Sequence, residues 1–506
     1  MDLNTSAVRV PAVLACPLRE AGIEPERIVD VAEDSRQVVP GGLFAALPGR
    51  DRHGLEFAAD AKARGAVGVI SDRAGPAAGL PVVTTTDPRA DLALLCRALA
   101  GPLPAKRIAV TGTRGKSSTL AYWRQLLALS GIRVGSVGSL GLQTGADECR
   151  RQPITADGYE FTTPPVSVLY RNLRKLREEG CTHVGVEASS QGLAQERLRE
   201  LDPSAAGWTD FTPAHQECHG SVAAYFAAKN RLIAETLRPA SRVVVGRRFP
   251  GLRRVEETCR RRGHRLVRAD DGADGFHLRA AEERLDRLRL SVAAGGRDRA
   301  VDVPLLGAWQ AVNLAVAVHL DLPEIAGGPD AVIDLLPRLR MPVGRMEKLA
   351  EGDGGRIIFS DYCSLPGAYA GALRFARRLA GRRLFVVFGC DGGRDPRIRP
   401  KIGRIVAQRA DAVWLTDLNP GAEDPAEIRA GVLAGLPGAN PDWHVVPDRG
   451  EAVRRAVRAA GDGDVVLLAG KGHEGFDLRA DGPVRQTDRE LARAAVGDAG
   501  PGWRTV

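Results

Sequence analysis

Lysine is scarce in this chain of 506 residues, although the chain is basic. Lys and Arg together number 71 against 62 Asp and Glu, which gives a net charge of +9, yet only eight of the cations are lysines. An ammonium and a planar guanidinium are not interchangeable. In a chain that uses arginine by default, we therefore expect some lysines to stand where a guanidinium cannot serve. The eight are Lys62, Lys106, Lys116, Lys175, Lys229, Lys348, Lys401 and Lys471.

Long hydrophobic runs and closely paired cysteines are also missing. No run of about 18 apolar residues occurs, and the N-terminus lacks the basic and apolar segments of a secretion signal. The eight cysteines contain no Cys-x-x-Cys pair, which argues against a zinc ribbon or a disulfide scaffold. We therefore expect a cytoplasmic protein in a reducing compartment, with no membrane partner.

Basic tracts interleaved with aromatic residues, which are typical of nucleic-acid-binding surfaces, do not occur. The arginines are scattered among acidic residues, as in Leu-Arg-Glu-Leu-Asp at 198–202. The use of arginine in place of lysine throughout the chain indicates a composition bias, and charges scattered in this way are typical of a solvated surface. We expect no nucleic-acid partner and a monomeric protein. A nucleic-acid- or nucleotide-binding module without enzymatic activity is the competing hypothesis.

Short apolar runs alternate with amphipathic helical patterns along the chain, as in α/β proteins with mostly parallel sheets. At about 150 residues per domain, the length corresponds to about three domains. A Gly-Pro-Leu-Pro segment at 101–104, and Pro337 with Pro342, predict the boundaries. The expected domains are 1–100, a small α/β unit; 101–340, with a P-loop ATPase-like sheet; and 341–506, with a Rossmann-like doubly wound sheet.

A glycine-rich turn follows the buried-strand pattern at 107–110. It reads Thr-Gly-Thr-Arg-Gly-Lys-Ser-Ser at 111–118 and runs into an amphipathic helical pattern. Glycines let backbone N–H groups approach phosphate oxygens, a helix N-terminus adds positive potential, and a lysine bridges the β- and γ-phosphates. The glycines are closer together than in the standard P-loop. The strand before the turn and the helix after it favour nucleotide binding over a plain surface turn.

Further motifs follow this loop in order. They are Val-Glu-Ala-Ser-Ser-Gln-Gly at 186–192, His-Gln-Glu-Cys-His-Gly at 215–220, and Tyr-Phe-Ala-Ala-Lys, which ends at Lys229. Taken singly, His215 and His219 are typical of a helix surface and Lys229 of a solvated helix. Together they resemble the motifs of the Mur ligases, which use ATP to join amino acids to peptidoglycan precursors. The likeness is greatest to the tripeptide synthetases of that family, the MurE type.

The resemblance implies an ATP-dependent carboxylate–amine ligase. ATP's γ-phosphoryl group would go to a substrate carboxylate, and an amino acid's amine would attack the acyl phosphate, releasing ADP and phosphate. Two Mg²⁺ sites and a carbamylated Lys229 are implied. The implied catalytic residues are Lys116, Glu187, His215 and Lys229. The implied Mg²⁺ ligands are Ser117, Glu187, His215 and carbamylated Lys229. The implied ATP-binding residues are Gly112, Thr113, Gly115, Lys116, Ser117, Ser118, Asn313, Arg345 and Asp361.

Further segments that resemble those of the family imply where the two small-molecule substrates bind. Gly-Cys-Asp-Gly-Gly-Arg-Asp at 389–395 and Ala-Gly-Lys-Gly-His-Glu at 469–474 resemble segments that contact the incoming amino acid. An arginine and an amide suit a carboxylate, and a glutamate suits an ammonium. The implied amine-binding residues are Arg394, Asn419, Gly421, Gly470 and Glu474. The implied residues for the acid substrate, a possible UDP-sugar peptide, are Ser35, Arg36, Thr162, Thr163, Ser189 and Arg197.

The positions at which this sequence departs from the family pattern are mostly among the residues implied to bind the acid and the amine. Leu-Asn-Pro-Gly at 418–421 stands where diaminopimelate-adding enzymes have Asp-Asn-Pro-Arg, so Gly421 lacks the guanidinium that grips the distal carboxylate. We therefore predict that meso-diaminopimelate is not the normal amine. Phe161 and Ser364 also replace family residues. These departures favour a MurE-like ligase with altered substrates, in secondary metabolism or for an atypical cell-wall precursor. The alternative is a genuine UDP-N-acetylmuramoyl-dipeptide ligase of peptidoglycan synthesis that is not specific for diaminopimelate.

Overall fold

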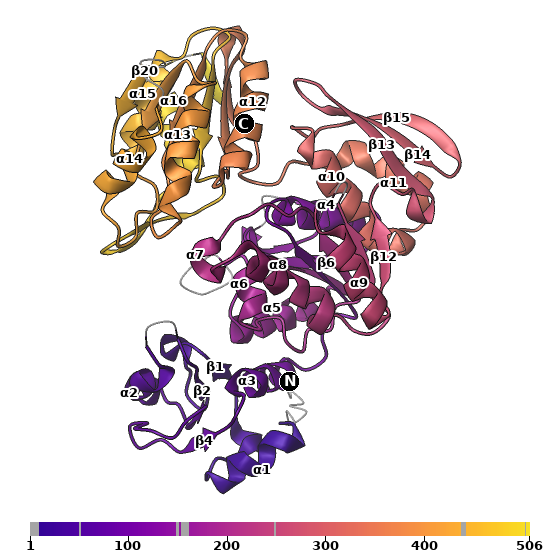
Figure 1. Cartoon of the computed structure of the whole chain (residues 1–506), viewed down its shortest axis with the longest axis vertical. Helices are drawn as coiled ribbons and strands as arrows, with labels where there is room; N and C mark the ends of the chain where they lie inside the picture. Colours follow the sequence, from indigo (N-terminus) through magenta and orange to yellow (C-terminus); the bar gives the residue numbers. More distant parts are fainter. Residues whose placement is uncertain are drawn as a thin grey trace, which may run out of the picture.

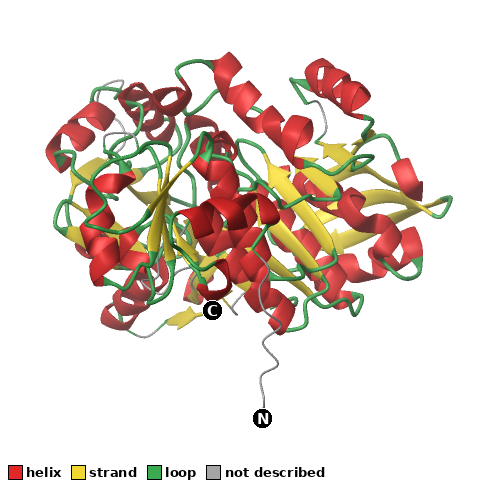
Figure 2. Ribbon diagram, turned by 90° about the horizontal axis from the view of Figure 1, so that it is seen from below, coloured by secondary structure: helices red, strands yellow, loops and turns green. Residues whose placement is uncertain are grey.

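The computed structural model describes residues 10–49, 52–147, 151–152, 161–246, 249–436, 442–500 and 502–506. Within them, three mostly parallel sheets follow one another along the chain, and Figure 1 shows them as separate bodies along the long axis of the molecule. Figure 2 shows helices surrounding the strands. The expected α/β class with mostly parallel sheets is confirmed.

The first sheet is small and parallel throughout, in the order β1-β2-β3-β4. Its interior is apolar, with Phe44 and Ile70 buried. The helix α3 begins after Asp87, whose side chain accepts a hydrogen bond from the backbone N–H of Ala90 and so caps the helix. The elements are α1 (Ala12–Glu20), β1 (Val31–Ala32), β2 (Leu43–Ala46), α2 (Ala58–Ala63), β3 (Gly68–Ser71), β4 (Val82–Thr84) and α3 (Pro88–Ala100).

The second sheet has eight strands in the order β12-β11-β10-β5-β9-β6-β7-β8. Strands β12 to β6 in this order are parallel, and β7 and β8 add an antiparallel edge. Since β10, β5 and β9 are neighbours, the loops at their carboxyl ends meet at one edge of the sheet. The strands are β5 (Lys106–Thr111), β6 (Val134–Gly138), β7 (Gly141–Thr144), β8 (Arg151–Gln152), β9 (His183–Glu187), β10 (Ala205–Trp208), β11 (Arg242–Val245) and β12 (Arg265–Arg268).

Helices and an antiparallel sheet complete this central body. The indole N–H of Trp123 on α4 donates to Asp321 on α10 at 2.9 Å, which joins the two helices across the core. The antiparallel sheet β13-β14-β15 lies beside α10 and α11 (Figure 1). The elements are α4 (Lys116–Leu129), α5 (Val166–Glu178), α6 (Ser190–Ala194), α7 (Gln216–His219), α8 (Val222–Arg231), α9 (Leu252–Arg262), β13 (Phe276–Glu283), β14 (Leu288–Ala294), β15 (Arg297–Val303), α10 (Trp309–Asp321) and α11 (Gly328–Leu335).

The third sheet has seven strands in the order β20-β19-β18-β21-β17-β16-β24. Its centre is parallel, and β16 and β24 are antiparallel at one edge. Separate apolar clusters cover its two faces, as a doubly wound sheet requires. The elements are β16 (Glu347–Gly352), β17 (Arg356–Asp361), α12 (Pro366–Leu379), β18 (Leu384–Phe388), α13 (Arg399–Ala407), β19 (Ala412–Leu415), α14 (Pro425–Leu433), β20 (Asp442–Val445), α15 (Arg449–Ala459), β21 (Val465–Ala469), β22 (Phe476–Arg479), β23 (Gly482–Arg485), α16 (Asp488–Asp498) and β24 (Trp503–Thr505).

The described ranges contain no helix that is both long and apolar enough to cross a bilayer. The cysteines within these ranges are free thiols. Cys149 lies outside the described residues.

Candidate active site

The glycine-rich turn lies between β5 and α4, as the sequence predicts. Gly112 has a φ of +148° and Gly115 a φ of +84°. A Cβ atom at Gly112 would collide with the hydroxyl of Thr209, and one at Gly115 would collide with the side-chain oxygen of Asn313. Both positions therefore require glycine, and the backbone can approach a ligand closely. Helix α4 begins at Lys116, so its free N–H groups open towards the same place.

A cavity of about 580 Å³, the main cavity, opens beside this turn. It is lined from the turn itself, from the carboxyl ends of β9 and β10, from α8 and α10, and from the first loops of the C-terminal body. Seventeen of the predicted site residues lie around it. They are Gly112, Thr113, Gly115, Lys116, Ser117, Ser118, Thr162, Thr163, Glu187, Ser189, Arg197, His215, Lys229, Asn313, Arg345, Asp361 and Arg394.

Glu187 lies at the end of β9, with its carboxylate against the glycine-rich turn. Ser117 Oγ donates to it at 3.1 Å, and the backbone N–H of Ser139 donates at 2.9 Å. Burial raises the pKa of Glu187, while Lys116 and Arg345 oppose this effect. A hydroxyl and a carboxylate are thus paired beside the lysine of the turn, and such oxygens are the ligands that Mg²⁺ prefers.

Lys229 projects from α8 into the wall of the main cavity and is 1% exposed. Its ammonium nitrogen lies 2.7 Å from the carbonyl oxygen of Gly112 and 4.7 Å from the ring centre of Tyr225. Burial, reinforced by the charge of Lys116, lowers the pKa of Lys229 well below its usual range. Burial thus disfavours the charged form of this side chain and brings the neutral, nucleophilic amine within easier reach.

His215 lies at the start of α7 in a left-handed conformation, with a φ of +54°. Burial and the charge of Arg394 lower its pKa to about 4. Its Nδ1 lies 3.3 Å from Glu217. Across the part of the chain that the structure describes, no three His, Cys, Asp or Glu side chains are close enough together to hold a metal ion. His215 therefore lines the same cavity as Ser117 and Glu187 without forming a closed ligand set with them.

Polar residues of the predicted acid site also line the main cavity, next to Glu187. Thr163 Oγ1 donates to the backbone oxygen of Glu187 at 2.7 Å, and its own backbone oxygen accepts from Arg197 at 2.6 Å. Ser189 contacts the same threonine at 3.0 Å. Ser35 and Arg36 lie in the N-terminal body and do not line this cavity; Arg36 pairs with Asp34 at 2.7 Å.

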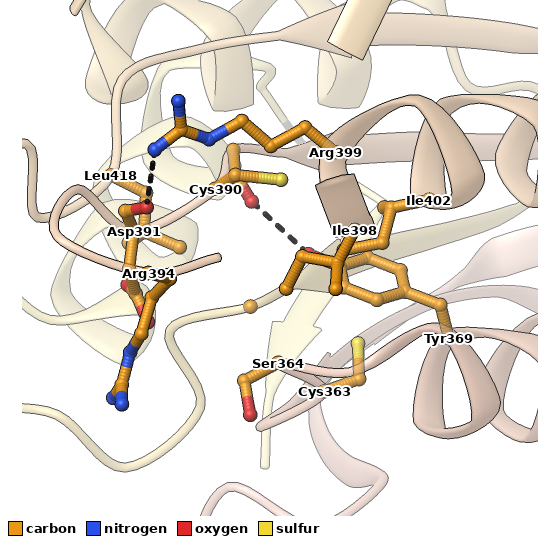
Figure 3. A pocket seen from close by; sticks show the side chains of 12 residues that line it. Cys363, Ser364, Tyr369, Cys390, Asp391, Arg394, Ile398, Arg399, Ile402 and Leu418 are labelled. Atoms are coloured by element: carbon orange, nitrogen blue, oxygen red, sulfur yellow. Dashed lines mark hydrogen bonds and ion pairs between the residues drawn. The ribbon is translucent and has the colours of Figure 1, made fainter. Parts of the chain in front are cut away.

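The predicted amine residues lie in the C-terminal body and divide among three places. The amide of Asn419 donates to Glu474 at 2.7 Å and to Asp391 at 3.2 Å. Gly470 and Arg394 line a small cavity of about 20 Å³, which Figure 3 shows between Tyr369, Cys390 and Asp391. Gly421 lines a third cavity, of about 440 Å³. Arg394 lines both the small cavity and the main cavity, so it connects the two.

Several residues around these cavities were not among the predicted site residues. Ser139 and Asp210 follow β6 and β10, and Asp210 holds the turn through the backbone N–H of Arg114 at 2.7 Å. Their position after parallel strands was the available signal. Tyr362 directly follows the predicted residue Asp361 in the sequence, and Asp391 lies three residues before Arg394. Burial raises the pKa of Asp391.

Sequence profiles of two Mur ligase domains match the chain: the Mur ligase middle domain at residues 110–320, and the Mur ligase glutamate ligase domain at residues 344–472. A UDP-N-acetylmuramoyl-L-alanyl-D-glutamate–2,6-diaminopimelate ligase of Bradyrhizobium diazoefficiens is 37% identical, over 94% of this chain and 97% of its own length. A UDP-N-acetylmuramyl-tripeptide synthetase of Leifsonia xyli is 35% identical, over 94% of this chain and 92% of its own length.

A solved structure of a UDP-N-acetylmuramoyl-L-alanyl-D-glutamate–2,6-diaminopimelate ligase has the same architecture, with a TM-score of 0.61 and 26% identity. It covers 93% of this chain, and this chain covers 95% of it. The profiles together cover more than half of the chain, and the relatives extend the match to nearly its whole length. The chain therefore belongs to the Mur ligase family of ATP-dependent ligases.

Proposed function

We propose that this protein joins the amine of an amino acid to the carboxylate of a UDP-N-acetylmuramoyl dipeptide, and that the amino acid is not 2,6-diaminopimelate. The observation that carries the proposal is the main cavity, which brings a phosphate-binding turn, a buried carboxylate and a buried lysine together with Arg394 of the C-terminal body. The proposed units are 1–100 for the acid substrate, 101–340 for ATP and 341–506 for the amine.

The reaction we propose has two steps. A carboxylate oxygen of the acid attacks the γ-phosphorus of ATP, the bond from that phosphorus to the bridging oxygen of ADP breaks, and ADP leaves as the acyl phosphate forms. The neutral amine then attacks the acyl carbon, phosphate leaves, and the amine loses a proton as the amide forms. The turn at 112–115, with Lys116 and the N-terminus of α4, is suited to binding the phosphate oxygens through both steps.

The residues present suit magnesium. Ser117 and Glu187 provide paired oxygen ligands, and His215 and a carbamylated Lys229 would hold a second ion. The metal would supply charge neutralisation along the phosphates. The burial of Lys229 supports carbamylation, because it lowers the pKa of the amine and only a neutral amine attacks carbon dioxide. The nitrogen bonds to the carbon, releases a proton and becomes an anionic carbamate.

The choice of amine follows from Gly421. Gly421 has no side chain to reach a distal carboxylate, and its own cavity is lined by Asp417, Asp477 and Asp481. The same cavity is also lined by Arg449 and Arg479, and Arg479 pairs with Asp477, so the proposal about the amine rests on the missing side chain of Gly421. The name of the Bradyrhizobium relative specifies diaminopimelate, whereas the name of the Leifsonia relative specifies only the tripeptide product.

A second candidate, a ligase of the same chemistry with a different acid, is favoured by Phe161. Its ring lines the acid end of the main cavity, 5.9 Å below the guanidinium of Arg197. A pathway-specific ligase of secondary metabolism would use such an altered acid site.

Phosphate release tests both candidates. The protein is incubated with ATP, Mg²⁺ and pairs of acids and amines, and phosphate is measured for each pair. We expect release only when an acid and an amine are both present, with UDP-N-acetylmuramoyl dipeptide active and diaminopimelate a poor amine. Activity with other carboxylates alone would favour the second candidate. Phosphate release that depends only on nucleic acid would exclude a ligase.

A further inference from the structure

Arg345 connects the phosphate-binding turn to the C-terminal body. One nitrogen of its guanidinium, Nη2, donates to Ser117 Oγ at 3.1 Å. The other, Nη1, donates to Nδ1 of His473 at 3.0 Å. Since Arg345 has no acceptor atom, His473 accepts with an unprotonated Nδ1. The orientation of the guanidinium group is therefore fixed by two hydrogen bonds. One is made to the glycine-rich turn, and the other is made to the imidazole of His473.

Close backbone packing keeps His473 in this position. A Cβ atom at Gly344 would collide with the backbone nitrogen of His473, and one at Gly472 would lie 2.6 Å from Cβ of Tyr362. The backbone N–H of Tyr362 donates to the oxygen of Gly344 at 2.8 Å. The segments around 344, 362 and 472 thus contact each other through their main chains, and neither glycine can be replaced without separating them.

Tyr362 packs against both partners of the hydrogen bond. Its ring lies 4.7 Å below the guanidinium of Arg345, and the ring of His473 meets it edge to face with centres 4.6 Å apart. Tyr362 and Arg345 line the main cavity. His473 is 6% exposed and lies behind them, so a substrate in the main cavity meets Arg345 rather than the imidazole.

The residue after His473 belongs to the proposed amine site. Glu474 accepts from the amide of Asn419 at 2.7 Å. A movement of this short loop therefore displaces the phosphate-facing guanidinium and the amine-facing carboxylate together.

We propose that His473 is a positioning residue: its Nδ1 holds the guanidinium of Arg345 on Ser117 and so ties the phosphate site to the loop that carries Glu474. The inference rests on the proposed ligase function for its kinetic consequences. In this role His473 does not touch a substrate. What matters is that its Nδ1 accepts a hydrogen bond from Arg345, and not that its ring fills space.

Two substitutions separate these roles, because their acceptor atoms differ in position. In His473→Asn, the side-chain oxygen takes the place of Nδ1. In His473→Gln, the oxygen takes the place of Nε2, so Nη1 of Arg345 loses its side-chain acceptor and keeps only the backbone oxygen of Gly344 at 3.2 Å. A hydrogen bond to a charged group contributes enough for kcat/KM for ATP to fall about tenfold to a hundredfold when it is lost. We expect that loss in His473→Gln and near wild-type values in His473→Asn. A packing role predicts the reverse, because glutamine fills more of the volume.

The matched control is His444, which is half-exposed in the same body and pairs with Asp442 at 3.3 Å. His444→Gln should leave the kinetics unchanged. Thermal unfolding of each variant shows whether it is folded. A double-mutant cycle adds a second measurement: in an Arg345→Lys background, His473→Gln should have little further effect on kcat/KM, because the shared contact is already lost. Equal losses in the Asn and Gln variants, or additive effects in the cycle, overturn the proposal.

Titration of ATP with Mg²⁺ into the full-length protein separates this inference from the proposed function. We expect weaker ATP binding for His473→Gln than for His473→Asn, whatever acid and amine the protein uses. If the wild-type protein binds ATP but turns over no acid–amine pair, the proposed function fails, and the ranking of the two variants in ATP binding still decides the role of His473. Equal affinity in both variants contradicts the inference.

Discussion

At the scale of single residues, the most consequential side chain is Lys229, because its burial changes its chemistry. Burial and the charge of Lys116 lower its pKa well below the usual range, which makes the neutral, nucleophilic form of the amine easier to reach. We expect Lys229→Ala to lose ligase activity by about a hundredfold, because the proposed carbamate would no longer be present to hold a metal ion. Bicarbonate together with short carboxylic acids should restore part of it.

Lys175→Ala is the control for that change, because Lys175 is an exposed residue of α5. Measuring phosphate release for both variants, with and without bicarbonate, decides the role of Lys229. Full activity of Lys229→Ala would refute the assignment.

Gly421 carries the prediction about the amine. Its φ is +59°, a Cβ atom there would meet nothing within 4 Å, and the position opens on a cavity, so a side chain can be introduced at a backbone cost of about 1–2 kcal/mol. We expect Gly421→Arg to raise kcat/KM for diaminopimelate about tenfold relative to lysine, which lacks the distal carboxylate. The ratio is measured by competition between the two amino acids. If the wild-type protein already prefers diaminopimelate, the side-chain argument is wrong.

Some residues of the candidate site could be predicted from the sequence, and others could not. The scarcity of lysine directed attention to Lys116 and Lys229, and both line the main cavity. Asp391 was quoted within its motif without a role, yet it contacts Asn419. A motif match gives the identity of residues and their order along the chain. The contact between Asp391 and Asn419, which are 28 positions apart, depends instead on how the strands β18 and β19 pair.

At the scale of elements, helix α10 contains a histidine that links stability to pH. His319 is fully buried, its ring nitrogens have no hydrogen-bond partner within the described residues, and its ring lies 5.9 Å from Phe276. Burial lowers its pKa to about 4, although Asp274 opposes the shift. Above pH 6.5 the ring is neutral in both states and stability is unaffected. As the pH falls from 6.5 towards 4, the unfolded chain takes up a proton that the folded chain refuses, so stability decreases.

The expected loss over that interval is about 3 kcal/mol in the free energy of unfolding. His319→Leu removes the group, so its unfolding free energy should depend less on pH between 6.5 and 4 than that of the wild-type protein. Denaturant unfolding at several pH values measures the difference. His444→Gln should leave the wild-type dependence in place, and identical pH slopes for His319→Leu and the wild-type protein would show that His319 does not carry it.

Helices could be predicted from the sequence where the periodic pattern of apolar residues extends over many positions. Apolar residues recur with a helical period over 307–320, 367–380 and 488–496, which predicts helices there, and α10, α12 and α16 lie within a few residues of these ranges. Short strands such as β16 and β24 were not predicted. They are edge strands whose formation depends on pairing with a neighbour rather than on their own residues.

At the scale of the whole molecule, polar contacts join the central and C-terminal bodies around the main cavity. Arg345 contacts Ser117, and Glu283 accepts from the backbone N–H of Ala308 at 2.8 Å while pairing with Arg378 of α12. The sequence could indicate the bodies and their order, because motifs and linkers are local features. It could not indicate these contacts, which depend on the relative placement of the bodies.

Ligand binding is expected to change the thermal stability of the whole molecule. ATP with Mg²⁺ should raise the thermal unfolding midpoint, since a ligand at about 100 times its Kd adds about 2.7 kcal/mol to the folded state. Lys116→Ala should abolish the shift, and DNA or RNA should give none despite the net charge of +9. Differential scanning fluorimetry measures each case. A shift with nucleic acid and none with ATP would support the competing binding-module hypothesis.

The central claim is that the protein activates a carboxylate by transferring ATP's γ-phosphoryl group to it. The most direct test uses an acid substrate whose carboxylate carries ¹⁸O, followed by mass spectrometry of the released phosphate. If an acyl phosphate forms, one carboxylate oxygen remains on phosphorus, and the phosphate is labelled in every turnover that makes amide. Unlabelled phosphate, or AMP and pyrophosphate in place of ADP and phosphate, would contradict the account.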